Sequence, residues 1–195
     1  MGFLTRNQII EMGFLHVGEN TYLSDRASYY NCANIVIGDN VRIDDFCVIS
    51  AGAGGIEIGN YIHIAVFCLL TGAGKITLDD FSGLSSRVSI YSSSDDYSGN
   101  SMTNPMVPKE YTNVYNAGIS IGQHVIIGSG SILLPGVTLE QGVAIGALSL
   151  VSKNCKEFGI YSGVPSKRIK ERKKHLLELE QQFFDKMNSA QPPNN

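Results

Sequence analysis

The chain has 195 residues, of which 43% are hydrophobic and 17% are charged, and its formal net charge is −3. This size suits one domain with a tail, and this composition suits a globular protein. The negative balance leaves no overall positive field, so we expect no nucleic-acid partner. No apolar run approaches the roughly 20 residues that a membrane-spanning helix needs, so we expect no membrane partner either.

The first residues, MGFLTRNQII, show no targeting signal. They lack the apolar core and the small-residue cleavage site that a secretory signal requires. They also carry Arg6 at the position where myristoylation requires Ser or Thr. We therefore expect a cytoplasmic protein.

A six-residue repeat with interruptions runs through the first half of the chain. An aliphatic residue opens each copy, and the fifth residue is usually small or β-branched. Three of the four cysteines, Cys47, Cys68 and Cys155, stand fifth in a copy, so we interpret them as core residues. No group of His and Cys has the spacing of a metal site. The copies are VGENTY at Val17, IGDNVR at Ile37, IDDFCV at Ile43, IGNYIH at Ile58, IAVFCL at Ile64, LDDFSG at Leu78 and LSSRVS at Leu84.

Residues 91–120 break the repeat. This stretch contains SSSDDYSG and NPMVP, and its tyrosines and prolines predict an ordered loop. Long ordered loops in compact domains are usually functional. Asp95 and Asp96 stand at its start, and an aspartate there either takes part in a site or caps a turn.

Residues 121–156 divide without interruption into the hexads IGQHVI, IGSGSI, LLPGVT, LEQGVA, IGALSL and VSKNCK. Six residues make a short strand and a turn, so three hexads make one triangular coil whose first and fifth positions point inward. An α-helix is excluded because a period of six does not match 3.6 residues per turn. A β-sandwich remains an alternative, although it requires no fixed six-residue frame.

The segment after residue 156 leaves the repeat through SGVPSKRI. The following residues predict a helix with one apolar stripe. We therefore divide the chain into a β-helix domain over 1–165 with its loop at 91–120, a helix over 166–190 and a frayed tail over 191–195. The predicted stripe consists of Ile169, Leu176, Leu177, Phe183, Phe184 and Met187.

The hexads over 121–156, followed by YSGVPSKRIKER, resemble the hexapeptide-repeat acyltransferases, and the resemblance covers roughly residues 15–170. It implies an all-β fold, a left-handed parallel β-helix, which is an exception to the usual right-handed crossover. It also implies a homotrimer with active sites between neighbouring subunits, and acyl transfer from coenzyme A. In that family a loop at this place reaches a neighbouring subunit and helps to form the acceptor pocket.

Basic residues gather after the last hexads, where eight of the 15 Lys and Arg residues lie between positions 153 and 174. They form either a solvated helix face or a docking surface for the phosphates of acetyl-coenzyme A. The resemblance implies cofactor contacts by Lys153 and Arg168. It also places the backbone of four small residues along the pantetheine arm: Gly128, Ser129, Gly146 and Ala147.

The catalytic histidine of many O-acetyltransferases in this family stands in a stretch resembling SHDYS, and this chain has SDDYS instead. Asp95 takes the place of the histidine, and Asp96 matches the neighbouring aspartate. A carboxylate is a weak base for a hydroxyl but is sufficient to hold or deprotonate an amine. The departure favours N-acylation, and SSSDDYSG resembles the N-acyltransferases of nucleotide-linked 4-amino-4,6-dideoxy-sugars.

Two further positions are candidates. The frame predicts that Glu140 lies over Gly122 and near Asp95 at one edge of the coil, where the substrate would sit between the two carboxylates; a solvated corner residue is the alternative. Ser85 or its neighbour Ser86 would donate a hydrogen bond to the thioester oxygen; an ordinary turn hydroxyl is the alternative.

The sequence therefore predicts an enzyme that moves an acetyl or similar small acyl group from acetyl-coenzyme A to the amino group of a nucleotide-linked amino sugar, without a metal. An O-acetyltransferase with a histidine base is one alternative. The histidines, His16, His63, His124 and His175, lie away from the loop entrance, and we interpret His124 as a surface residue. A non-catalytic β-helix scaffold is the other alternative.

Overall fold

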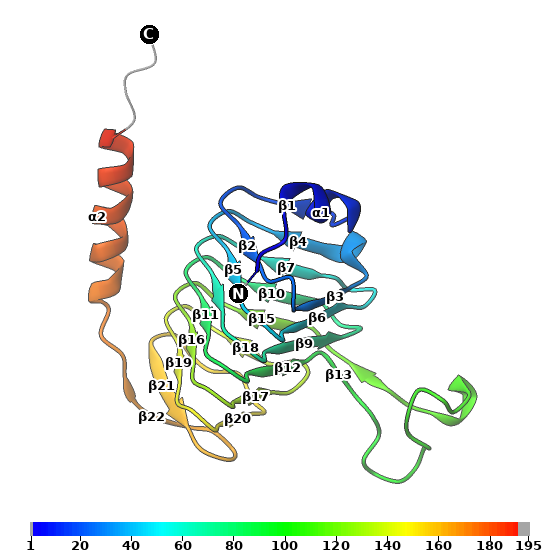
Figure 1. The fold of residues 1–195 in the computed structure, drawn as a ribbon. Coiled ribbons are helices and arrows are strands. Elements are labelled where there is room, and N and C mark those ends of the chain that lie inside the picture. Colours follow the sequence, from blue (N-terminus) through cyan, green and yellow to red (C-terminus); the bar gives the residue numbers. More distant parts are fainter. Residues whose placement is uncertain (1, 191–195) are drawn as a thin grey trace.

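The computed structural model describes residues 2–190, which form a triangular solenoid of parallel strands (Figure 1). A short helix, α1 (Arg6–Glu11), covers the first coil, and a longer helix, α2 (His175–Ala190), stands beside the solenoid. Two 3-10 helices, η1 (Cys32–Asn34) and η2 (Lys109–Tyr111), lie in connections. The tail predicted over 191–195 lies outside the described residues.

Three sheets make the faces of the solenoid, and all their strands pair parallel except β22. The first face consists of β1 (His16–Val17), β4 (Ile35–Ile37), β7 (Ile56–Ile58), β10 (Ile76–Leu78), β15 (Ile119–Ile121) and β18 (Thr138–Leu139). The second face consists of β2 (Tyr22–Leu23), β5 (Arg42–Ile43), β8 (His63–Ile64), β11 (Gly83–Leu84), β16 (Ile126–Ile127), β19 (Ala144–Ile145), β21 (Gly159–Ser162) and β22 (Lys167–Glu171). The third face consists of β3 (Ser28–Tyr30), β6 (Val48–Ala51), β9 (Leu69–Gly72), β12 (Ser89–Tyr91), β17 (Ile132–Leu133) and β20 (Leu150–Val151).

The six-residue frame predicts which residues are buried. Ile37 and Ile121, which open hexads on the first face, are fully buried, and so is Val41 at a fifth position. Cys47, Cys68 and Cys155 are buried free thiols, which confirms their interpretation as core residues. The fold is thus the left-handed parallel β-helix that the sequence predicts.

The fourth residue of a hexad makes the corner and adopts a positive φ, except for Asn154 in the last hexad. Gly142 has φ +70° at this position, where glycine is free of the strain that a side chain brings. Glycine at the second position has another function, because a Cβ on Gly122 would lie 2.9 Å from the backbone nitrogen of Gln141 on the next coil. Gly122 therefore allows the coils to pack closely.

Aromatic side chains at fourth positions form a ladder at the corner between the first and second faces. Tyr61 stacks on Phe81 with ring centroids 4.9 Å apart, and Phe81 stacks on His124 at 5.1 Å. Helix α2 covers this ladder through Phe183 and Phe184, both of which belong to the predicted apolar stripe. His124 is therefore packed beneath α2 with 11% of its side chain exposed, and its interpretation as a surface residue is wrong.

The predicted helix over 166–190 begins later than expected, at His175. Residues Lys167–Glu171 form β22 instead, which pairs antiparallel with β21, and Ile169 is exposed on that strand. The unpaired backbone at the edge of the last coil provides hydrogen-bond partners that outweigh the helical preference of this charged stretch. Between residues 2 and 190 there is no helix with both the length and the hydropathy to cross a bilayer.

Candidate active site

A groove of about 340 Å³ lies where the second face meets the third. Gly83 has no side chain to fill the surface between its neighbours, and the following corner turn brings two serines to the rim. Three successive coils contribute to the groove, and its lining residues are His63, Ala65, Gly83, Leu84, Ser85, Ser86, Ile126 and Ser129.

Ser85 stands directly after β11, in the turn that leads to the third face. Its backbone N–H donates to the carbonyl of Ile127 on the next coil at 2.9 Å, which fixes the turn. Its hydroxyl is half-buried and has no hydrogen-bond partner among residues 2–190. The structure therefore leaves this hydroxyl free to donate to a bound group in the groove.

The four small residues predicted along a pantetheine arm lie together at the same corner. A Cβ on Gly128 would lie 2.5 Å from the backbone nitrogen of Ala147, so the coils touch at this point. The carbonyl of Ser129 accepts from the N–H of Leu148 at 2.9 Å, and Gly146 donates to Tyr161 at 2.8 Å. These residues therefore bring the backbones of two successive coils close together at this corner, beside the groove that Ser129 lines.

The two basic residues predicted to contact the cofactor lie apart in one chain. Arg168 is on β22, and its guanidinium donates to both carboxylate oxygens of Glu171 at 2.6 and 2.7 Å. This contact raises the pKa of Arg168 above its ordinary value. Lys153 is exposed after β20, at the far end of the third face. Their cofactor role stays a prediction.

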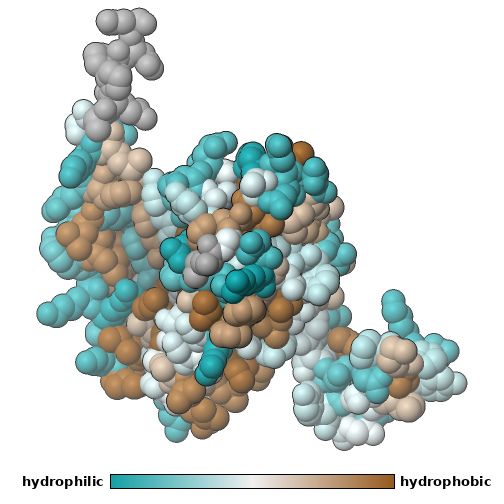
Figure 2. All heavy atoms as spheres, in the orientation of Figure 1, coloured by the Kyte–Doolittle hydropathy of each residue, from teal (hydrophilic) through white to brown (hydrophobic). Residues whose placement is uncertain are grey.

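The excursion predicted over 91–120 leaves the far end of the third face through a two-stranded neck, β13 (Ser93–Ser94) and β14 (Tyr115–Asn116). The rest of it stands away from the solenoid as a separate lobe (Figure 2). Tyr97 and Met106 in this lobe are 93% and 90% exposed. Such large exposed side chains on a projecting loop fit contact with another molecule.

The two aspartates at the neck have different surroundings. Asp95 is exposed, and its carboxylate has no hydrogen-bond or ion-pair partner within the described part of the chain. Asp96 accepts from the N–H of Ser98 at 2.8 Å. Hydrogen bonds from Ser98 lower the pKa of Asp96 below its ordinary value. These contacts favour the turn-capping interpretation for Asp96 and leave Asp95 available.

Glu140 does not lie near Asp95 in one chain. It follows β18 at the corner between the first and second faces, whereas Asp95 follows the third face. The carboxylate of Glu140 accepts from Lys156 at 2.7 Å and from the N–H of Glu157 at 3.1 Å, and these contacts lower its pKa. The prediction of a shared edge is wrong for a single chain, and a carboxylate with a lowered pKa is a poor proton acceptor.

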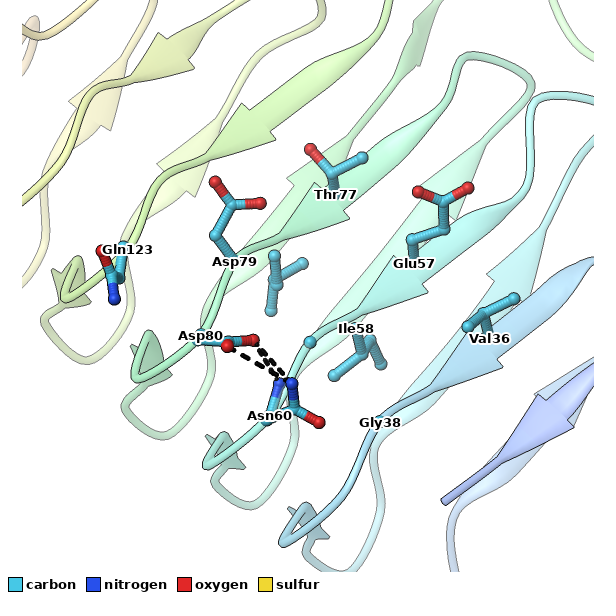
Figure 3. Close-up of a pocket in the computed structure, with 11 residues that line it drawn as sticks. Val36, Gly38, Glu57, Ile58, Asn60, Thr77, Asp79, Asp80 and Gln123 are labelled. Atoms are coloured by element: carbon cyan, nitrogen blue, oxygen red, sulfur yellow. Dashed lines mark hydrogen bonds between the residues drawn. The ribbon is translucent and has the colours of Figure 1, made fainter. Parts of the chain in front are cut away.

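A larger groove of about 620 Å³ lies on the first face, and Figure 3 shows its acidic lining. Glu57 points outward from β7 and Asp79 points outward directly after β10, and Asp80 accepts hydrogen bonds from the backbone and the side chain of Asn60. Burial and the neighbouring Asp80 raise the pKa of Asp79. Carboxylates repel phosphate groups, so this groove suits a phosphorylated ligand less well than the groove beside Ser85.

His63 also lines the Ser85 groove, although no sequence pattern assigns it a role there. His63 stands last in its hexad, on β8, and its Nε2 lies 2.8 Å from the carboxylate of Asp44. The only signal in the sequence is its register: His63 lies opposite Gly83 on the preceding coil, where glycine leaves the groove open. Of the other histidines, His124 contacts Glu180 on α2 at 2.9 Å, and His175 lies at the start of that helix.

Comparison with known proteins identifies relatives over nearly the whole chain. No protein-family model matches it. A curated protein of Escherichia coli, dTDP-4-amino-4,6-dideoxy-D-glucose acyltransferase, is 58% identical over 183 residues, which are 94% of this chain and 95% of the relative.

Solved structures agree with this relative. AntD, an N-acyltransferase from Bacillus cereus in complex with dTDP and 3-hydroxybutyryl-CoA, superposes with a TM-score of 0.91 at 43% identity, over 95% of this chain and 98% of that chain. A maltose O-acetyltransferase from Clostridium difficile 630 superposes with a TM-score of 0.56 at 24% identity, over 87% of this chain and 75% of that chain, and shows the fold alone.

Proposed function

The chain belongs to the acyl-coenzyme A-dependent acyltransferase family that contains dTDP-4-amino-4,6-dideoxy-D-glucose acyltransferase and AntD, and we propose on this premise that it acylates the amino group of a nucleotide-linked amino sugar. The acceptor is dTDP-4-amino-4,6-dideoxyglucose or a close relative. The donor is the coenzyme A thioester of an acetyl or similar small acyl group. A cytoplasmic location stays a prediction.

One observation carries this proposal. Separate variants of AntD replace a serine and an aspartate that stand ten positions apart in its chain, and these variants hold dTDP or dTDP-4-amino-4,6-dideoxyglucose together with coenzyme A. Ser85 and Asp95 also stand ten positions apart, and both carry side chains without a partner in the described chain. The free side chains of Ser85 and Asp95, at the same spacing as the serine and aspartate of AntD, support N-acylation by this chain.

The proposed reaction is a single acyl transfer. The amine nitrogen attacks the thioester carbonyl carbon, the carbon–nitrogen bond forms, and the carbon–sulfur bond then breaks. Ser85 donates a hydrogen bond to the carbonyl oxygen as its negative charge develops. Asp95 holds the amine in position for attack. Gly128, Ser129, Gly146 and Ala147 accommodate the pantetheine arm, and Lys153 and Arg168 meet the phosphates.

A second subunit is part of this proposal, because one chain does not bring its two candidate groups together. Ser85 lies at the beginning of the third face and Asp95 beyond its end. The projecting loop would carry Asp95 to the groove of a neighbouring copy. Exposed apolar side chains near the groove also need cover; they include Phe46, Phe67, Ile126, Ile132 and Leu148.

We therefore expect a homotrimer at micromolar concentration, measured by sedimentation equilibrium. Shortening the loop between β13 and β14 to a tight turn should weaken the assembly, while the circular dichroism of the solenoid is retained. A monomeric wild-type protein with full activity would contradict the shared site.

The experiment that tests the function is turnover against a panel of acceptors and donors. The acceptors are dTDP-4-amino-4,6-dideoxyglucose, its 4-hydroxy analogue and a free amino sugar, each with acetyl-coenzyme A and with 3-hydroxybutyryl-coenzyme A. Release of the free thiol reports acyl transfer. We expect transfer to the nucleotide-linked amine and little to the other two acceptors. Preferred transfer to the hydroxyl would support an O-acetyltransferase, and no transfer together with no binding of coenzyme A would support a scaffold.

A further inference from the structure

We propose that His63, held by Asp44, is the proton acceptor of the reaction, taking the proton that the sugar amine loses and passing it to the coenzyme A sulfur. The inference rests on the proposed function and adds a second acid–base element to it. It follows from where the β-helix places one histidine and one buried carboxylate on neighbouring coils.

The contact between the two residues is set by the register of the coils. Arg42 pairs with His63 across β5 and β8, so Asp44, two residues after Arg42, lies beside the imidazole. His63 Nε2 is 2.8 Å from Asp44 Oδ2, and Arg42 Nε donates to Asp44 Oδ1 at 2.7 Å. Both oxygens of this carboxylate are thus engaged, and only 9% of the side chain is exposed.

The charge on Asp44 determines which ring nitrogen of His63 carries the hydrogen in the neutral imidazole. Burial alone would raise the pKa of Asp44, but the hydrogen bonds from Arg42 and His63 outweigh it and hold this pKa below its ordinary value. An ionised carboxylate only accepts hydrogen bonds, so Nε2 must carry the hydrogen. In the neutral ring Nδ1 then has a free lone pair, and it has no hydrogen-bond partner in residues 2–190.

The position of the ring is right for proton transfer in the groove. His63 lines the same groove as Ser85, and 55% of its side chain is exposed. Its partner in register on the next coil is Gly83, which has no side chain to cover it. The charged groups beside the ring are Arg42 and Asp44 on its preceding coil, while the following coil contributes Gly83 and the uncharged Ser85.

The chemistry needs such a group. The attacking amine becomes positively charged as the carbon–nitrogen bond forms, and the sulfur becomes negatively charged as the carbon–sulfur bond breaks. One proton must move from nitrogen to sulfur, and no oxidant or further reactant is required. An imidazole accepts and releases a proton near neutral pH more readily than a carboxylate does. Asp95 then orients the amine, and His63 moves the proton.

The test is His63→Gln, compared with His175→Gln. Glutamine retains an amide that can donate to Asp44 but cannot accept the proton as imidazole does. His175 is a matched control because its Nδ1 also contacts a carboxylate, Glu178 at 2.9 Å, and 64% of its side chain is exposed, away from the groove. We expect kcat to fall about 10²-fold in His63→Gln, with little change in either KM. His175→Gln should retain the wild-type kcat.

A second measurement begins with the wild-type protein and therefore does not depend on the His63→Gln variant. In nitrogen-15 spectra of the wild-type protein at mildly alkaline pH, His63 should show the tautomer with hydrogen on Nε2, and Asp44→Asn should reduce the population of that tautomer. A His63 ring with hydrogen on Nδ1, or an unchanged kcat in a folded His63→Gln, would overturn the inference while wild-type transfer keeps the proposed function. A wild-type protein that acylates no amine would overturn both.

Discussion

Replacing Asp95 with Asn should lower kcat by about 10²-fold or more, because the substitution keeps the shape of the side chain and removes the charge that holds the amine. The carboxylate is exposed and has no partner elsewhere in residues 2–190, so the fold should not depend on it. Steady-state kinetics with dTDP-4-amino-4,6-dideoxyglucose as the acceptor would measure the loss.

Asp96→Asn is the matched control for this prediction. Asp96 caps a turn through Ser98 Nα at 2.8 Å, and an asparagine oxygen can accept the same hydrogen bond. We therefore expect a smaller loss at position 96 than at position 95. An Asp95→Asn enzyme with wild-type kcat, or equal rates on hydroxyl and amine acceptors, would refute the role of Asp95.

Ser85→Ala should lower kcat by about 10² to 10³-fold, the usual result of removing one hydrogen-bond donor from a developing oxyanion. The serine turn is fixed by its backbone N–H, which alanine retains, so the groove should keep its shape. The KM for the thioester should change little, because the hydrogen bond strengthens only as the charge develops. Initial rates of thiol release at several thioester concentrations would give both kcat and KM.

Ser86→Ala separates Ser85 from its neighbour, since both serines line the groove. If Ser85 is the donor, Ser86→Ala should retain most of the wild-type kcat. The reverse order of losses would assign the hydrogen bond to Ser86, and two active single variants would leave the oxyanion to a backbone donor and contradict the proposal.

The core of the β-helix could be predicted because it depends on local periodicity alone. Every hexad forms the same strand and turn wherever it lies in the chain, so the burial of Ile37 and Cys155 follows from their positions within their hexads. The pairing of Ile76 with Ile119 across the excursion follows in the same way, since the frame resumes after residue 118. The same periodicity brings together the four small residues at the corner between the second and third faces, Gly128, Ser129, Gly146 and Ala147.

The sequence-based predictions were wrong or silent where the position of a corner is not given by the hexad frame, and where a contact joins segments that are distant in the sequence. Extra residues enter between the third and first faces, so Ile58 pairs with Ile37 across a longer interval than Leu139 pairs with Ile121. Glu140 was misplaced for a different reason: the corner was expected where a hexad starts, but Leu139 is the last residue of β18 and Glu140 begins the turn after it. Neither the strand β22 nor the contact of His63 with Asp44 has a local signal, because each depends on which coil lies next to it.

The docking of α2 has a consequence for how this chain unfolds. A solenoid whose coils touch only their neighbours unfolds from its ends in steps, because its stability is a sum of nearest-neighbour terms. Here Phe183 and Phe184 contact the rings of Tyr61 and Phe81, which belong to successive coils, and Glu180 contacts His124 on the next. The helix thus couples three coils from outside, so that the middle of the solenoid should melt as one cooperative unit.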